Sequence, residues 1–289
     1  MKINRQWYKL KEQGAGEKRL FLTWFLYKTL GKRALYAIAF LVSAVVFFTA
    51  KERRNAGVKF FKVIQKKHPC INAFKLFVNY GKSLADKIIS FSGEMKKDNF
   101  VIENNEDFKG TFFITTHIGN VEILRSLFEE DDNIKVNVFL QKNFCETFNN
   151  FLKKIEKQVN LETWAVEEIG IETSILIKEK LEKGEVVFMA GDRISAQNEN
   201  ACYEVDFFEQ KISLPLGTLK FALLTGARIA FIVCVKEGSL YKIYVQKFIP
   251  KSDKKAEILE ELKQSYTKFL EEFTLKYPNQ VYNFYDVFE

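Results

Sequence analysis

Histidine and cysteine are scarce in this chain. Its 289 residues include two histidines, His68 and His117, and four cysteines. The cysteines, at positions 70, 145, 202 and 234, are far apart and form no C-x-x-C pair. Such a set makes no recognisable zinc-binding pattern and does not suggest a disulfide framework. The sequence therefore indicates a reducing, cytoplasmic compartment, and it suggests neither a metal nor another cofactor.

The chain also lacks internal repeats, low-complexity linkers and a signal-peptide pattern. Its first apolar run begins only near residue 20, and no small-x-small cleavage site precedes a mature domain. Because no linker marks a domain boundary, the clearest change along the chain is in net charge. Residues 1–67 hold 16 Lys and Arg against 3 Asp and Glu, so they carry +13 of a net +7 and the remainder carries −6. We therefore divide the chain into a basic, apolar N-terminal helical region, 1–67, and a second region, 68–289.

The second region alternates strand-like and helix-like segments. This alternation predicts an α/β fold with a mostly parallel central sheet flanked by helices. Strands are expected at 111–116, 135–141, 162–166, 185–190, 229–235 and 241–247, and helices at 55–67, 72–93, 143–159, 171–181 and 256–277, with a further apolar helix after residue 218.

An uncharged run of 17 residues, 34–50, dominates the first region and has cations at both ends. About 20 residues cross the hydrocarbon core of a bilayer, so this run is at the lower limit for a spanning helix. Three interpretations remain: a monotopic half-inserted hairpin, a short spanning anchor, or a buried core helix. We favour membrane contact, because basic residues beside an apolar segment suit an anionic membrane surface. Nucleic acid is not an expected partner, since the positive charge does not lie on a polar face.

The candidate catalytic residues lie in the stretch 111–128. An apolar strand is expected to end at His117, and a helix is expected to follow the Gly119-Asn120 turn with Glu122 in its first turn. In one continuous helix, residues five apart point about 140° away from each other, since each residue turns the helix by roughly 100°. A turn between them instead allows the Glu122 carboxylate to hold the imidazole ring and leave its other nitrogen as a base. The alternative is a core histidine with a carboxylate nearby.

This stretch resembles a known family. The string His-Ile-Gly-Asn-Val-Glu-Ile-Leu-Arg, from His117, is similar to the signature of the bacterial lipid A late acyltransferases and their predicted relatives in the lysophospholipid acyltransferase superfamily. The resemblance covers roughly residues 5–289 and includes Gly191-Asp192-Arg193, the blocks at 205–208 and 214–218, Thr-Gly-Ala before a strand, and an aromatic tail at 277–288. Val281 and Val287 stand where relatives tend to have tryptophan.

The resemblance implies a membrane-associated enzyme at the cytoplasmic face of the bacterial inner membrane. Such an enzyme moves a fatty acyl group from an acyl-carrier protein or coenzyme A thioester to a hydroxyl or amine of a lipid or glycolipid. His117 would be the general base, with Glu122 as its partner. Two alternatives are an acyltransferase acting on a lysophospholipid or aminolipid and a non-catalytic lipid-binding protein of the same fold.

Further residues are assigned to substrate binding. Backbone N–H groups near Gly119 and Asn120 are candidates for stabilising an oxyanion. Arg125 and Arg193 are candidates for phosphate binding, and Asp192 and Arg193 follow a strand, on the same rim as His117. In the family interpretation, Pro215 and Gly217 shape a loop over the acceptor, and Thr218 donates a hydrogen bond at the start of a helix. The simpler alternatives are an Asp–Arg turn pair and a loop with an N-capped helix.

Overall fold

A computed structural model describes residues 17–103, 107–128, 134–154, 160–194 and 201–288 of the chain. The start of the predicted basic region, residues 1–16, lies outside this set. So does the end of the helix predicted at 143–159.

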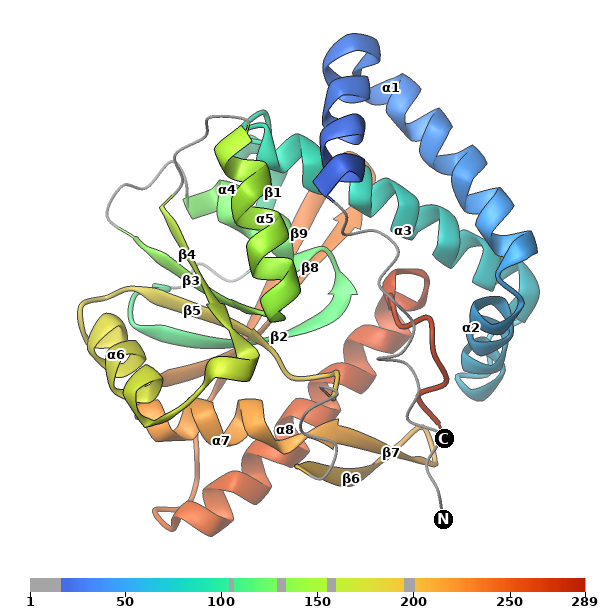
Figure 1. Ribbon diagram of the computed structural model, residues 1–289. Helices are drawn as coiled ribbons and strands as arrows, with labels where there is room; N and C mark the ends of the chain where they lie inside the picture. Colours follow the sequence, from blue (N-terminus) through green and yellow to red (C-terminus); the bar gives the residue numbers. More distant parts are fainter. Residues whose placement is uncertain (1–16, 104–106, 129–133, 155–159, 195–200, 289) are drawn as a thin grey trace.

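A seven-stranded sheet forms the centre of the molecule, in the order β1-β9-β8-β2-β5-β3-β4 (Figure 1). Five neighbouring strands, from β8 to β4, run parallel, whereas β9 is antiparallel to β8 and β1 runs alongside β9. The predicted α/β fold with a mostly parallel sheet is thus confirmed. The strands are β1 Phe100–Ile102, β2 Thr111–Gly119, β3 Val136–Leu140, β4 Leu161–Ala165, β5 Val186–Ala190, β8 Arg228–Glu237 and β9 Leu240–Phe248.

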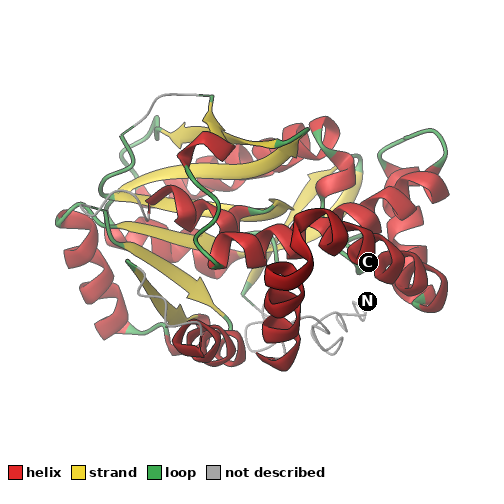
Figure 2. Cartoon of the chain, turned by 90° about the horizontal axis from the view of Figure 1, so that it is seen from above, coloured by secondary structure: helices red, strands yellow, loops and turns green. Residues whose placement is uncertain are grey.

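Helices cover both faces of this sheet, which Figure 2 shows from above. One face packs against α6 (Ile171–Glu182), α7 (Leu216–Thr225) and α8 (Lys255–Lys276). The other packs against the short η3 (Val121–Leu124) and α4 (Arg125–Phe128), near α5 (Lys142–Lys154).

The central strand β2 is buried on both sides. Phe112 meets Phe221 of α7 edge-on, with ring centroids 5.6 Å apart. The next residue, Phe113, stacks on Phe188 at 4.9 Å on the opposite face. Successive side chains of a strand point to opposite faces, so a strand covered on both sides needs a continuous apolar run.

Among the described residues, three α-helices precede the sheet: α1 (Glu17–Thr49), α2 (Lys51–Val63) and α3 (Pro69–Phe91). Helix α1 is broken at Gly31, whose φ of +77° is not helical. From Lys18 to Thr49 it is long and apolar enough to cross a membrane, a property shared with signal sequences and with buried core helices. Helix α1 lies along α3, so the two predicted regions are in contact with each other (Figure 1). The division of the chain at residue 67 stays a prediction.

The structure differs from expectation in several places, and strand β1 is one element that was not predicted. Strand β2 continues through His117 to Gly119, with an irregularity after Thr115, and the segment that follows begins as a 3₁₀ turn. An antiparallel hairpin of β6 (Cys202–Phe207) and β7 (Gln210–Pro215) was not predicted. Its turn residues, Phe208 and Glu209, both have positive φ, a geometry usually signalled by asparagine or glycine, and the sequence carries neither there.

Candidate functional site

A cavity of about 710 Å³ opens at the carboxyl ends of β2, β3 and β5. This is the edge of an open α/β sheet where ligands commonly bind. Eight of the ten site residues proposed from the sequence line it: His117, Gly119, Asn120, Glu122, Arg193, Pro215, Gly217 and Thr218. The remaining two are Asp192, which lies behind the imidazole, and Arg125, whose side chain is outside the described part of the chain.

His117 is held by Asp192. The ring Nδ1 lies 2.7 Å from Asp192 Oδ1, and the His117 backbone N–H donates to Oδ2, also at 2.7 Å. Asp192 follows β5, the parallel neighbour of β2, so the register of the sheet brings the two residues together. With both carboxylate oxygens engaged, ring and carboxylate are fixed relative to each other.

This arrangement selects the tautomer of the ring. A carboxylate accepts the Nδ1 proton, which leaves Nε2 as the basic nitrogen. Burial raises the pKa of Asp192, but the adjacent His117, its hydrogen bonds and the charge of Arg193 outweigh burial and hold that pKa below its usual value. The carboxyl group is therefore ionised at neutral pH. The His117 side chain is 34% exposed, and within the described residues Nε2 has no hydrogen-bond partner.

Glu122 does not hold the ring, and the expected His117–Glu122 pair is corrected here. Glu122 forms an ion pair with Lys87 of α3. Because β2 extends beyond His117, the imidazole stays in strand geometry and Glu122 falls in the separate η3 turn. The signal for the true partner was present in the sequence, since Asp192 had been placed on the same rim. Lys87 was missed because it lies on another helix, among apolar residues.

The Gly119-Asn120 segment packs closely against β8. Gly119 has a φ of +73°, and a Cβ there would collide with the carbonyl oxygen of Cys234. The same oxygen accepts the Asn120 backbone N–H at 2.6 Å, and the Asn120 side chain donates to Ser83 O of α3 at 2.9 Å. The Asn120 N–H is therefore occupied, which corrects its assignment as an oxyanion donor.

Arg193 binds the C-terminal tail. Its guanidinium donates to Tyr282 O at 2.7 Å and to Asn283 Oδ1 at 3.1 Å. The Tyr282 backbone N–H in turn donates to His117 O at 3.0 Å. These bonds give Arg193 a structural role, and because its side chain also lines the cavity, its phosphate-binding role stays a prediction.

Thr218 also has a structural partner. It lies in the first turn of α7, is buried, and its hydroxyl donates to Ala190 O at the end of β5, at 2.8 Å. It therefore links α7 to β5, the strand that precedes Asp192. Pro215 precedes the helix, and Gly217 faces open space within the cavity wall, since no atom lies within 4 Å of a Cβ built there.

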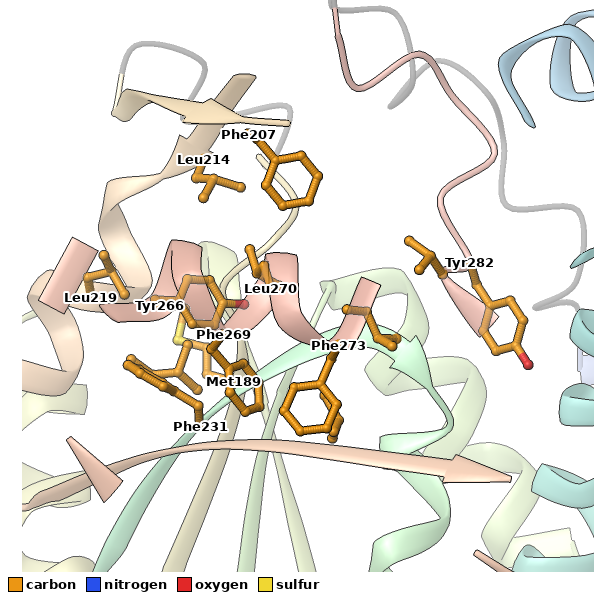
Figure 3. Packing of buried hydrophobic residues seen from close by; sticks show 14 of the residues in the cluster. Met189, Phe207, Leu214, Leu219, Phe231, Tyr266, Phe269, Leu270, Phe273 and Tyr282 are labelled. Carbon is orange, nitrogen blue, oxygen red and sulfur yellow. The ribbon is translucent and has the colours of Figure 1, made fainter. Parts of the chain in front are cut away.

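Tyr266 of α8 contacts β2 two residues before His117. Figure 3 shows Tyr266 among the buried aromatic residues on the face of the sheet that α8 covers. Its hydroxyl donates to Thr115 O at 2.7 Å. Gly191 leaves room for this contact, because a Cβ there would lie 2.7 Å from Ile114 and 3.0 Å from the Tyr266 ring. Tyr266 falls within the helix predicted at 256–277, for which the sequence suggests no functional residue.

The remaining wall of the cavity is largely apolar. It comes from α1, α3, β3, β4 and β5 and includes Leu20, Ile88, Phe91, Val138, Leu161 and Phe188. In the described part of the chain, no three His, Cys, Asp or Glu side chains are grouped so that they could bind a metal ion. The site thus combines an oriented imidazole base with a large apolar cavity.

Comparison with models of known protein families finds no match to this chain, and a search of curated proteins finds none either.

Proposed function

We propose that this protein is a membrane-associated acyltransferase. It would transfer a fatty acyl group from an acyl-carrier protein or coenzyme A thioester to a hydroxyl or amine of a lipid or glycolipid. The single observation that carries the proposal is an imidazole base, held by a buried carboxylate, on the wall of an apolar cavity of about 710 Å³. The motif at 117–125 adds the resemblance to lipid A late acyltransferases.

The reaction needs one base that later acts as an acid. Nε2 of His117 removes the proton from the acceptor hydroxyl as the oxygen attacks the thioester carbonyl. Asp192 stabilises the imidazolium that forms. When the tetrahedral intermediate collapses, the C–S bond breaks, and the imidazolium returns its proton to the leaving thiolate. The products are an ester, or an amide for an amine acceptor, and a free thiol.

Glu122 receives a revised role. Its side chain is 44% exposed on the cavity wall and is held by Lys87, so one carboxylate oxygen is placed to accept a hydrogen bond from the acceptor. This would orient the acceptor for attack, whereas the proton goes to His117. Arg125 stays a candidate for phosphate binding.

The first helix supports the proposed localisation at a membrane. The apolar α1, with basic residues at its ends, suits the cytoplasmic face of a bacterial inner membrane, where both thioester donors are made available. The acidic surface of a carrier protein would also suit the basic N-terminal region.

The direct test uses purified full-length protein, a radiolabelled long-chain acyl thioester and a bacterial lipid extract, with thin-layer separation of the products. Transfer should occur with the wild-type protein and disappear in His117→Ala. The other histidine provides a matched control, because His68 is exposed at the start of α3 and lies outside the cavity; His68→Asn should transfer normally. Unchanged transfer by His117→Ala would reject the base, and lipid binding without any transfer would favour a non-catalytic lipid-binding protein.

The labelled product also identifies the acceptor class. A labelled glycolipid would place the protein beside the lipid A acyltransferases. A labelled diacyl phospholipid or aminolipid would instead indicate the alternative, the same chemistry on a lysophospholipid or aminolipid.

A further inference from the structure

Helix α1 is a bent rod made of two arms. The first arm, 17–30, and the second, 32–49, meet at the non-helical Gly31 (Figure 1). At about 1.5 Å per residue, the arms measure roughly 21 Å and 27 Å, and each is shorter than the roughly 30 Å hydrocarbon core of a bilayer. The break argues against one continuous span of 33 residues, because the irregular backbone at Gly31 would be exposed to lipid.

The second arm has a buried side and an exposed apolar side. Leu35, Ser43 and Phe47 are buried, and the packing is close, since a Cβ on Gly81 of α3 would collide with Ser43 Oγ. The opposite side is exposed, although it is equally apolar. It is centred on Leu41 (63% exposed), Val45 (62%) and Phe48 (70%), and Val42 (56%) and Phe40 (44%), whose ring also meets Phe74 of α3, lie at its flanks.

A buried polar cluster fixes this arm to the body of the protein. Asp86 of α3 is fully buried and accepts hydrogen bonds from Tyr36 of α1, Lys236 of β8 and Tyr241 of β9, each at 2.5 Å. If α1 swung away to cross a bilayer, Tyr36 would leave and the cluster would open to solvent or lipid. The arm therefore stays beside α3, which carries the exposed Lys75 and cannot itself enter hydrocarbon.

The first arm joins this apolar surface to the cavity. Leu20 and Trp24 pack against the buried cluster of Ile88, Phe91 and Phe151 on the inner side. Leu20 and Thr23 also line the cavity. Its outer side exposes a second apolar patch, made of Phe21, Leu22, Phe25 and Leu30. Both arms thus present apolar residues outward, and cationic side chains accompany them at Lys18, Lys28, Lys32, Arg33 and Lys51.

We propose that α1 does not cross the membrane, but lies half-inserted as a bent wedge in one leaflet of an anionic phospholipid bilayer. The exposed stripes of the two arms enter the acyl region, and the cations meet the headgroups. The domain stays on the side from which α1 inserts, with the cavity wall formed by the first arm next to the lipid. This placement concerns α1 alone and does not depend on the proposed chemistry.

The first experiment measures binding to preformed vesicles of phosphatidylglycerol and phosphatidylcholine by flotation. Leu41→Glu combined with Val45→Glu should weaken binding roughly tenfold or more, because both side chains lie in the inserted stripe. Leu224→Glu combined with Ile249→Glu is the matched control, since Leu224 of α7 is 71% exposed, Ile249 after β9 is 76% exposed, and both lie outside α1; binding should not change. Equal loss in both pairs, or equal binding to vesicles of phosphatidylcholine alone, would overturn the proposal.

The second experiment distinguishes a wedge from a span. In a Cys70→Ser background, Arg33→Cys and Lys51→Cys place a thiol at each end of the second arm, and both positions are exposed. Protein bound to preformed vesicles is treated with a membrane-impermeant maleimide, with the background protein as the blank. A wedge predicts that both thiols react to the same extent without detergent. Protection of either thiol until detergent is added would show that the helix spans, whether or not the protein transfers acyl groups.

Discussion

Replacing Asp192 by asparagine removes the charge behind His117 and keeps the shape of the side chain. Both Asp192 oxygens accept hydrogen bonds, one from the ring Nδ1 and one from the His117 backbone N–H. An amide has only one oxygen, and the backbone N–H can only donate, so that oxygen must face the backbone. The NH₂ group then points at Nδ1, and the ring must carry its proton on Nε2. In that tautomer, the nitrogen needed as the base is already protonated.

The expected loss has two parts. A hydrogen bond to a charged group contributes about 1.5–3 kcal/mol, which is roughly 10- to 100-fold in rate when the imidazolium loses its counter-charge. The inverted tautomer adds to this, and in serine proteases the equivalent Asp→Asn change lowers kcat about 10⁴-fold. For Asp192→Asn we therefore expect kcat to fall by about 10²- to 10⁴-fold, with little change in KM.

The assay is the initial rate of thiol release from an acyl thioester in the presence of acceptor lipid, with thermal unfolding as the check on folding. Glu122→Gln is the matched comparison, because it makes the same chemical change at a carboxylate that lines the cavity. Since Glu122 bonds to Lys87 and not to the ring, its main effect should be a higher KM for the acceptor, and kcat should fall no more than about tenfold. A larger loss of kcat in Glu122→Gln than in Asp192→Asn would refute the assignment of Asp192 as the partner of the base.

Three further predictions concern stability. Gly119→Ala should destabilise the fold by about 3 kcal/mol or more, since it combines a positive φ with a collision at Cys234 O; Gly238→Ala, also at positive φ but with open space, should lose only about 1 kcal/mol in the same urea titration. Asp86→Ala should lower the unfolding free energy by about 3 kcal/mol, because it strips a buried ion pair of its anion, and chemical denaturation measures this. The pKa of Asp192 is lower in the folded state than its unfolded-state pKa, which is near 3.9, so above that pH the ionised carboxylate stabilises the fold. This contribution is lost as the pH falls through the folded-state pKa. Unfolding midpoints between about pH 5 and pH 2 should therefore fall less steeply in Asp192→Asn than in the wild-type protein.

Local patterns predicted most of the elements. The strands at 136–140 and 186–190 and the helices at 171–182 and 255–276 lie within one or two residues of their expected bounds. These segments have strong periodicity or continuous burial, which depends on near neighbours alone. The β6–β7 hairpin was not predicted, because its turn residues, Phe208 and Glu209, adopt positive φ values that usually occur at asparagine or glycine.

The candidate site divides in the same way. His117, Asp192 and the rim they share were indicated by the sequence, because parallel neighbouring strands end at one edge of a sheet. The sequence did not indicate whether Glu122 or Asp192 is the partner of His117, because that choice depends on how far β2 extends and on its register with β5. The roles of Asn120 and Arg193 likewise depended on a carbonyl of β8 and on a tail about 90 residues away.

The amino-acid sequence by itself determined that this is an α/β protein with a histidine at the end of a buried strand and an apolar, basic N-terminus. Burial patterns and backbone preferences are local, so they can be read along the chain. Only the tertiary structure decided which carboxylate holds that histidine, which donors are already occupied, and how α1 is fixed beside α3. Each of these depends on groups far apart in sequence that meet only when the sheet is assembled.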